Sequence, residues 1–101
     1  MRRYTTPTHI FTMPFETTEI EKARVIYAQG EKPVFVKELE ECQCNGRTLS
    51  VTLTQEETAL LDCKKGFVDI QAHILTTDGQ SLVSEPVRVP VKKCFDTEVL
   101  S

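Results

Sequence analysis

The 101-residue chain has no long hydrophobic run, few glycines and no strong excess of charge of either sign. Nowhere do about 18 apolar residues follow one another. The two arginines in MRRYTTPTHI precede no apolar stretch of signal-peptide length. The sequence therefore predicts no membrane span and no secretory signal. We expect a protein that stays in the cytosol or leaves it by a route other than secretion, with its four cysteines as thiols rather than disulfides.

Acidic and basic residues are almost balanced along the chain. The chain has fifteen Asp and Glu and twelve Lys and Arg residues, which leaves a net charge of −3. No basic stripe is present to neutralise phosphates, so nucleic acid is not an expected partner. The length fits one domain over residues 1–101 that buries roughly 60–70% of the surface of its unfolded chain. Such a domain is marginally stable, and a partner chain would add stability.

Catalytic motifs are also missing. The sequence contains no G-x-S-x-G, no H-E-x-x-H and no phosphate-binding glycine loop, and only four glycines in all. We expect the two histidines to be surface residues, His73 in mid-strand facing outward opposite Ser84 and His9 at the start of the first strand. The sequence therefore predicts a protein that is not an enzyme and uses no cofactor.

Alternation of apolar and polar residues is the main signal that the chain does carry. RTLSVTL and VRVPVKK each place every second residue on one face, as half-buried antiparallel strands do. Further strands are predicted at Thr8–Pro14, Lys22–Gln29, Pro33–Leu39 and Phe67–Thr76. About seven strands with turns every 8–12 residues indicate an all-β fold, an immunoglobulin-like (Greek-key) sandwich. A small open barrel is the alternative.

Asp78-Gly79 predicts a two-residue type I′ turn, because both residues tolerate positive φ. Counting outward from this turn sets Leu75 against Leu82 and Val68 against Val89. The buried face then carries Val68, Ile70 and Ile74, and Pro86 indicates a bulge or an edge position.

Asn45-Gly46 predicts a second type I′ turn, which would set Cys42 against Leu49. Glutamates would then fall on the buried face, so we expect a break near Glu40-Glu41. Before that break, Val34 and Val36 follow an inward pattern.

The stretch LTQEETALLD is the one segment with a helical pattern. Thr54 and Glu57 have the spacing of a capping box, which predicts a short helix near residues 54–62. We interpret it as a crossover between the two sheets. Ala59, Leu60 and Cys63 would then close one end of the sandwich.

Four cysteines could in principle bind zinc. Cys42 and Cys44 form a single C-x-C pair, while Cys63 and Cys94 are far away in sequence. Structural zinc sites use two pairs with C-x₂₋₄-C spacing, so we favour buried thiols for Cys42 and Cys44. A cytosolic zinc-binding protein that uses all four is the alternative function.

One predicted feature favours a protein partner. In the register above, Phe67, Leu75 and Leu82 lie on the outward face together with Pro90. Outward faces of sheets are normally polar, so this strip is covered either by another chain or by the segment around Phe11, Met13 and Phe15. These four residues are the predicted protein interface.

Three motifs carry a family resemblance over nearly the whole chain: L-T-Q-E-E-T at Leu53–Thr58, I-Q-x-x-x-L-T-T-x-G at Ile70–Gly79 and D-x-E-V-L at Asp96–Leu100. The sequence resembles short proteins encoded in prophages and phages of Gram-positive gut bacteria. More distantly, it is similar to the N-terminal β-sandwich of phage baseplate upper proteins. The resemblance implies a virion or assembly component that self-associates or binds another phage tail protein, located in the bacterial host cytoplasm during assembly and in the virion.

Overall fold

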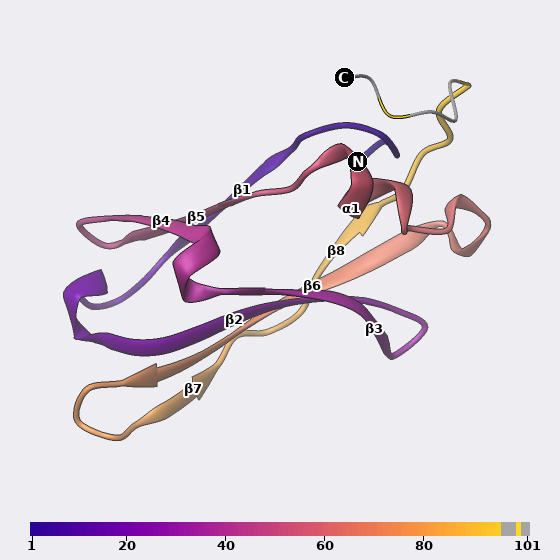
Figure 1. Ribbon diagram of the computed structural model, residues 1–101. Helices are drawn as coiled ribbons and strands as arrows, with labels where there is room; N and C mark the ends of the chain where they lie inside the picture. The colour runs from indigo at the N-terminus through magenta and orange to yellow at the C-terminus, as the bar shows by residue number, and fades with distance from the viewer. Residues whose placement is uncertain (96–98, 100–101) are drawn as a thin grey trace.

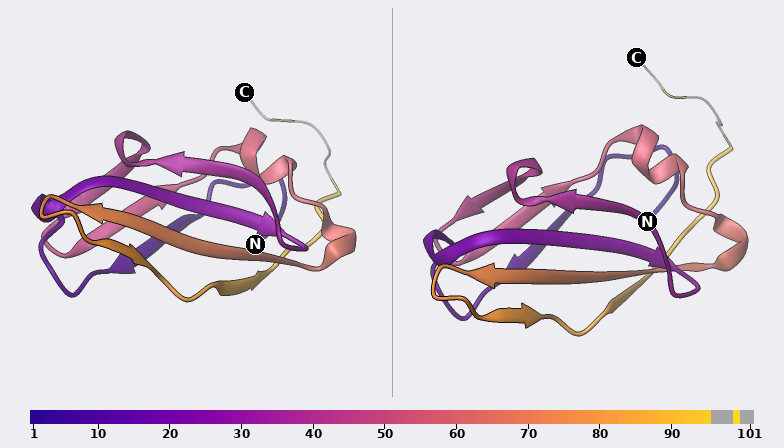
Figure 2. Two further views of the ribbon diagram at one scale, coloured as in Figure 1. Left: turned by 90° about the horizontal axis from the view of Figure 1, so that it is seen from below. Right: turned by 60° about the horizontal axis from the view of Figure 1, so that its bottom comes forward.

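The computed structural model describes residues 1–95 and 99, so the motif at Asp96–Leu100 lies outside the described residues except for Val99. Two antiparallel sheets pack face to face (Figures 1 and 2). The strands are β1 (Thr8–Thr12), β2 (Ile20–Gln29), β3 (Lys32–Glu38), β4 (Cys42–Asn45), β5 (Thr48–Thr52), β6 (Phe67–Thr76), β7 (Ser81–Val83) and β8 (Val87–Pro90). The helical segments are α1 (Gln55–Ala59) and the 3₁₀ turns η1 (Thr17–Glu19), η2 (Leu39–Glu41) and η3 (Cys63–Lys65).

The strand order is that of an immunoglobulin-like sandwich. The smaller sheet has the order β1-β5-β4, and the larger one has the order β3-β2-β6, with β7 and β8 both paired to β6. These positions correspond to strands B-E-D and C′-C-F-G of the immunoglobulin fold. The predicted fold is confirmed, and the barrel alternative does not apply because the two sheets stay separate. Eight strands replace the predicted seven because Ser84–Pro86 interrupts the last one.

The core lies between the two layers and contains Val68, Ile70 and Ile74, as predicted. Leu49 and Val51 of β5 face them and are fully buried. Tyr27 of β2 is the largest fully buried side chain and stacks on Phe35 of β3, with ring centroids 4.7 Å apart. An immunoglobulin domain has a buried tryptophan on the strand that corresponds to β2, so Tyr27 takes that role in a chain without tryptophan.

The turn between β6 and β7 differs from the prediction. The Thr76 N–H donates to Gln80 O at 2.9 Å and only Gly79 within the turn has positive φ, so the loop has three residues instead of two. Leu82 therefore lies opposite Ile74, and the predicted Leu75–Leu82 pair is wrong by one residue. Past the break at Ser84–Pro86, Val68 pairs with Val89 as predicted, because that irregularity absorbs the extra residue.

The turn between β4 and β5 also differs. Asn45 pairs with Thr48, so the two-residue loop is Gly46-Arg47, and positive φ at Gly46 alone is typical of a type II′ turn. Cys42 consequently lies opposite Val51, two residues from its predicted partner. A shift of two residues leaves every side chain on its predicted face.

A type I′ turn does occur in the chain, at Gly30-Glu31 between β2 and β3. Both residues have positive φ, 58° and 67°, and they join the paired residues Gln29 and Lys32. The sequence analysis missed this turn because glutamate rarely adopts positive φ.

Each of the three connections between the two sheets contains a short helical segment: η1 between β1 and β2, η2 between β3 and β4, and α1 with η3 between β5 and β6. η2 follows β3 and leads into β4, which confirms the predicted break near Glu40-Glu41. The inward pattern predicted for β3 is only partly right: Val34 packs against the core, but Val36 is 37% exposed, while Phe35 and Lys37 lie inward.

The capping box at α1 is confirmed. The Glu57 N–H donates to Thr54 Oγ1 at 3.1 Å, and the Thr54 N–H donates back to the Glu57 carboxylate at 2.9 Å. The helix and η3 link β5 to β6, so the predicted crossover is also confirmed. Leu61, which is 1% exposed, and the half-buried Cys63 pack on the core at this end, so the prediction holds for Cys63, whereas Leu60 is 61% exposed.

Candidate interaction surfaces

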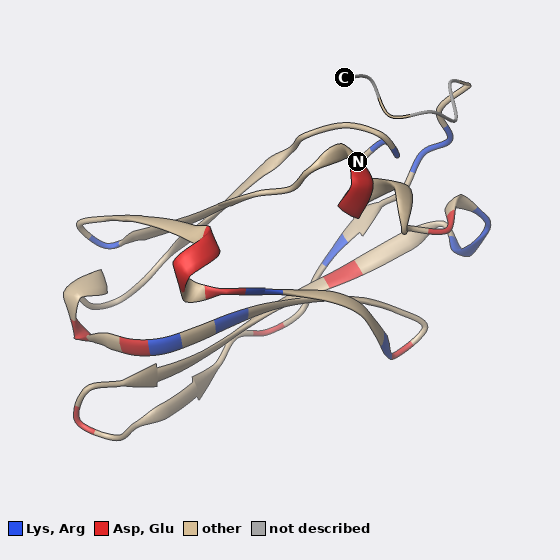
Figure 3. Cartoon of the chain, in the orientation of Figure 1, with Lys and Arg blue, Asp and Glu red and all other residues tan. Residues whose placement is uncertain are grey.

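The outer face of the smaller sheet carries no charged side chain. Its three strands, THIFT, CQCN and TLSVT, contain no Asp, Glu, Lys or Arg. Figure 3 shows this sheet almost free of charge colours up to the β4–β5 turn. The outward residues are hydroxyl and amide side chains around one isoleucine: Thr8, Ile10, Thr12, Gln43, Asn45, Thr48, Ser50 and Thr52. We call these eight residues the hydroxyl face.

The outer face of the larger sheet is charged instead. Arg24 of β2 pairs with Glu38 of β3 at 3.3 Å, and Arg88 of β8 pairs with Asp69 of β6 at 3.0 Å. These pairs are largely exposed to solvent, so each stabilises the fold only slightly.

The edge strands of the two sheets differ in the same way. β3 carries Lys32 and Pro33 on its free edge, and β7 and β8 are interrupted at Ser84–Pro86 and end at Pro90. Charges, prolines and irregularities of this kind prevent an edge from pairing with another chain. β1 has none of them within its five residues, and its Ile10 is 65% exposed.

An apolar groove of about 320 Å³ runs beside β1 on the inner side. Its walls include Phe11, Met13 and Phe15 from the N-terminal segment and Ile74 and Leu82 from the β6–β7 hairpin. The N-terminal segment therefore packs against the inner side of the larger sheet. It lies beside Leu82, one member of the predicted strip, rather than over the whole strip as one of our two alternatives supposed.

The predicted interface residues do not form one strip. Phe67, 49% exposed, pairs with Pro90 at one end of β6, and the Arg88 guanidinium lies 5.4 Å from the centre of its ring. Leu75 is half-buried near the other end of β6. Leu82 lies on the opposite face, because of the shifted turn. The structure thus keeps Phe67 and Pro90 together and separates them from the other two.

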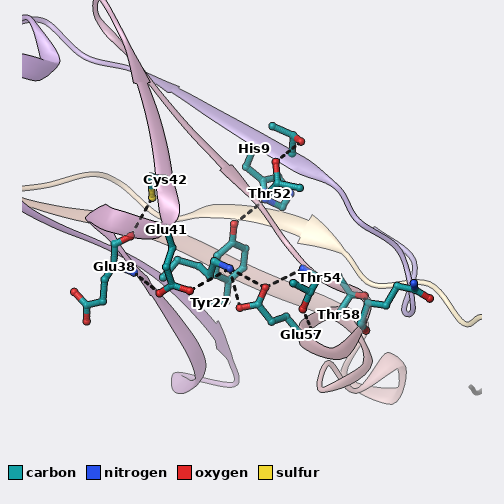
Figure 4. A network of polar contacts seen from close by, with 12 residues as sticks. His9, Tyr27, Glu38, Glu41, Cys42, Thr52, Thr54, Glu57 and Thr58 are labelled. Carbon is teal, nitrogen blue, oxygen red and sulfur yellow. Dashed lines mark hydrogen bonds and ion pairs between the residues drawn. The ribbon is translucent and has the colours of Figure 1, made fainter. Parts of the chain in front are cut away.

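His9 and Tyr27 join the two sheets in the interior (Figure 4). His9 Nδ1 lies 2.8 Å from the Tyr27 hydroxyl. Burial, with a smaller contribution from the charged N-terminus, lowers the pKa of His9, so its ring is neutral at pH 7. Burial, followed by the charges of Cys42 and Glu57, raises the pKa of Tyr27. The prediction that His9 is a surface residue is wrong.

A buried ion pair joins β3 to α1. Lys37 is 5% exposed, and its Nζ donates to the two oxygens of the Glu57 carboxylate at 2.9 and 3.0 Å. Glu41 lies 3.4 Å away on the other side. Burial alone would lower the pKa of Lys37, but Glu57 and Glu41 outweigh it and raise that pKa. Because Glu57 also caps the helix through Thr54, this cluster is structural (Figure 4).

The cysteines are dispersed. Cys42 is half-buried with its thiol 3.4 Å from Glu38 O, and burial is the main cause that raises its pKa. Cys44 is exposed, so its predicted burial is wrong, and Cys63 and Cys94 are half-buried free thiols. Within residues 1–95 and 99, no three His, Cys, Asp or Glu side chains come together as a metal site would require. The four cysteines of the alternative zinc-binding function are therefore not brought together among the described residues.

His73 makes a contact that the sequence analysis missed. Its register partner is Val83 rather than Ser84, and its Nε2 lies 2.9 Å from Ser81 Oγ on the exposed β6–β7 hairpin. A serine nucleophile needs a histidine that a third group orients. No carboxylate among residues 1–95 hydrogen-bonds to the His73 ring, so the pair lacks this third group.

Comparisons with known proteins add a single weak likeness. No family model matches the sequence, and no curated protein matches it either. Among solved structures, the V domain of amphioxus IgVJ-C2 aligns over 91% of this chain and 95% of that one, with 12% identity and a TM-score of 0.40. No described helix is long and apolar enough to cross a membrane.

Proposed function

We propose that this chain is a non-enzymatic structural or assembly protein of a phage or prophage. In this proposal it acts as a protein–protein interaction module of the tail or baseplate type. The phage context rests on the resemblance at Leu53–Thr58 and Ile70–Gly79. The interaction role rests on the surfaces of the sandwich.

The observation that carries the interaction role is that β1 is an edge strand without charges, prolines or bulges, whereas the edge strands of the larger sheet have them. β1 presents an uncharged edge beside an uncharged face, in a chain where 27% of the residues are charged. The centres of protein interfaces are depleted in charged side chains in the same way. An edge without lysine, proline or a bulge is a template for strand addition.

The proposed partner is a second copy of this chain or another tail protein. Neither nucleic acid nor a membrane is part of the proposal, because the net charge of −3 offers no basic surface to phosphates or to anionic lipids. The proposed location is the bacterial host cytoplasm during assembly and then the virion.

A stop codon in the gene, within an inducible prophage that carries it, tests the phage role. We expect electron micrographs of the induced lysate to show incomplete tails and the infectious titre to fall. A plasmid copy of the gene should restore both. Complete particles at an unchanged titre would refute the proposal.

A further inference from the structure

The free side of β1 is an open position in the sandwich. In immunoglobulin domains strand A pairs there, beside the strand that β1 corresponds to. Within residues 1–95 and 99, β5 is the one strand that pairs with β1. The residues before β1 lie elsewhere: Arg2 bridges to Lys92 after β8, and the Lys92 N–H donates to Met1 O at 2.7 Å. Main-chain groups on this side of β1 are therefore without strand partners.

The hydrogen bonds of β1 show which of its groups point outward. The Met13 N–H donates to Arg47 O at 2.7 Å, and Pro7 O accepts from the Leu53 N–H at 2.9 Å. Bonded and non-bonded residues alternate in an antiparallel pair, so odd-numbered residues bond to β5. The N–H and C=O groups of Thr8, Ile10 and Thr12 consequently point away from the sheet.

We propose that a second copy of this chain fills the open position by pairing its own β1, antiparallel, about a two-fold axis at Ile10. The strand is complementary to itself in this arrangement. Each pair would join side chains of the same kind. The hydroxyls of Thr8 and Thr12 would lie opposite each other, as would the rings of His9 and Phe11 and the two copies of Ile10. The outward groups of these residues would form about six main-chain hydrogen bonds. The two small sheets would become one continuous six-stranded sheet.

Side chains and prolines around the strand fit the same arrangement. Ile10 is the one apolar side chain of the hydroxyl face, and Ile10 of the second copy would cover it. Pro7 and Pro14 flank the strand on both sides, and Pro14 has no N–H to continue the ladder, so the paired length is fixed. On the inner side, the groove beside Phe11 and Leu82 would face the same groove of the second copy.

Charge favours β1 over the edge strands of the larger sheet for a like partner. Two copies each carry a net charge of −3 and repel one another weakly. Contact through β1 brings no charged side chain of the small sheet against another, because that sheet has none. Contact through β3 or β8 would place charged side chains such as Lys32 or Arg88 at the seam between the two copies.

The inference rests on the proposed function as an interaction module and specifies where and with what it binds. Sedimentation equilibrium over a concentration series tests it with Ile10→Lys and, as a matched control, Val36→Lys. Val36 is also an exposed β-branched residue on an edge strand, but of the larger sheet. We expect Ile10→Lys to raise the dimer dissociation constant at least about tenfold and Val36→Lys to leave it unchanged. Circular dichroism should show that both variants fold, because both positions are exposed.

Cross-linking gives a second, geometric readout. In a hydrogen-bonded antiparallel pair the two opposed Cα atoms are about 5.5 Å apart, within the range that a disulfide spans. Ile10→Cys should therefore form a disulfide between the two copies at residue 10 under mild oxidation, identified by peptide mass spectrometry. Val36→Cys is the control and should form no such disulfide.

The outcomes separate this inference from the proposed function. A monomeric parent at all concentrations, or a dimer that Ile10→Lys leaves intact with no disulfide at residue 10, overturns the two-fold pairing. In either case the particle defect caused by the stop codon still decides the phage role. A monomeric parent that binds another tail protein through β1 likewise overturns the pairing of two copies, since the occupant is then a different chain.

Discussion

The two sheets of this sandwich share one core but present opposite surfaces. The larger sheet has ion pairs on its outer face and lysine, proline and strand breaks along its edges. The smaller sheet has hydroxyl and amide side chains outside and an unguarded edge at β1. Charged residues cost little at a solvated face, and they discourage contact with other chains. The difference indicates that the outer face of the larger sheet suits contact with water and that the smaller sheet suits contact with another chain.

The largest expected effect comes from truncating Tyr27, the largest fully buried side chain of the core between the two sheets. Tyr27→Ala should lower the free energy of unfolding by about 3–5 kcal/mol, because it leaves a cavity between the sheets. Tyr27→Phe removes only the hydroxyl that meets His9 and should cost about 1 kcal/mol. Urea denaturation followed by circular dichroism measures both. Two separate transitions in either variant would contradict a single shared core.

A smaller effect is expected at the connection between the larger sheet and α1. Lys37→Ala leaves the Glu57 carboxylate half-buried without its cation and should lower the free energy of unfolding by about 2 kcal/mol. Lys64→Ala, on an exposed turn, is the matched control and should change stability little. Equal losses in the two variants would show that the buried ion pair contributes nothing beyond an exposed lysine.

The contact between His9 and Tyr27 predicts a dependence on pH. The pKa of His9 is lowered in the folded state, so the unfolded chain takes up the proton first as the pH falls below about 6.5. Stability that is present above about pH 6.5 is therefore lost as the pH falls toward the folded pKa. Thermal unfolding at pH 7.5 and 5.5 should show a loss in the parent and a smaller loss in His9→Phe. The same loss in both would place the titrating group elsewhere.

The smallest effect is expected on the charged outer face. Arg88→Ala removes the pair with Asp69, which is mostly exposed, and should cost under about 1 kcal/mol. The loss should shrink further in 1 M salt, where exposed charges are screened over about 3 Å. Chemical denaturation by urea at low and high salt checks this. A cost above 2 kcal/mol would mean that this face contributes more to stability than solvated ion pairs do.

Features fixed by neighbouring residues could be predicted from the sequence. The bounds of β6 at Phe67–Thr76, the capping box at Thr54 and Glu57, and the break near Glu40-Glu41 all depend on local chain chemistry. Turn registers could not be predicted, because Asp78-Gly79 fits both a two-residue and a three-residue loop. A change of one residue there moved Leu82 to the other face.

Features fixed by distant residues escaped the sequence analysis. Lys37 is buried only because α1 brings Glu57 to it from twenty residues away, and His9 is half-buried only because Tyr27 reaches it across the sandwich. The strands of the hydroxyl face are visibly uncharged in the sequence. Their significance depends on β1, β4 and β5 lying in one sheet, which the sequence did not reveal.

The composition of the hydroxyl face has a consequence for solution behaviour. Binding between charged surfaces weakens as salt is added, because ions screen the attraction. A contact made by threonine, serine and isoleucine contains no attraction between charges for salt to screen, and added salt also screens the repulsion between two copies of net charge −3, so such a contact should not weaken as salt is added. Its salt dependence would be opposite in sign to that of a contact held together by ion pairs between chains.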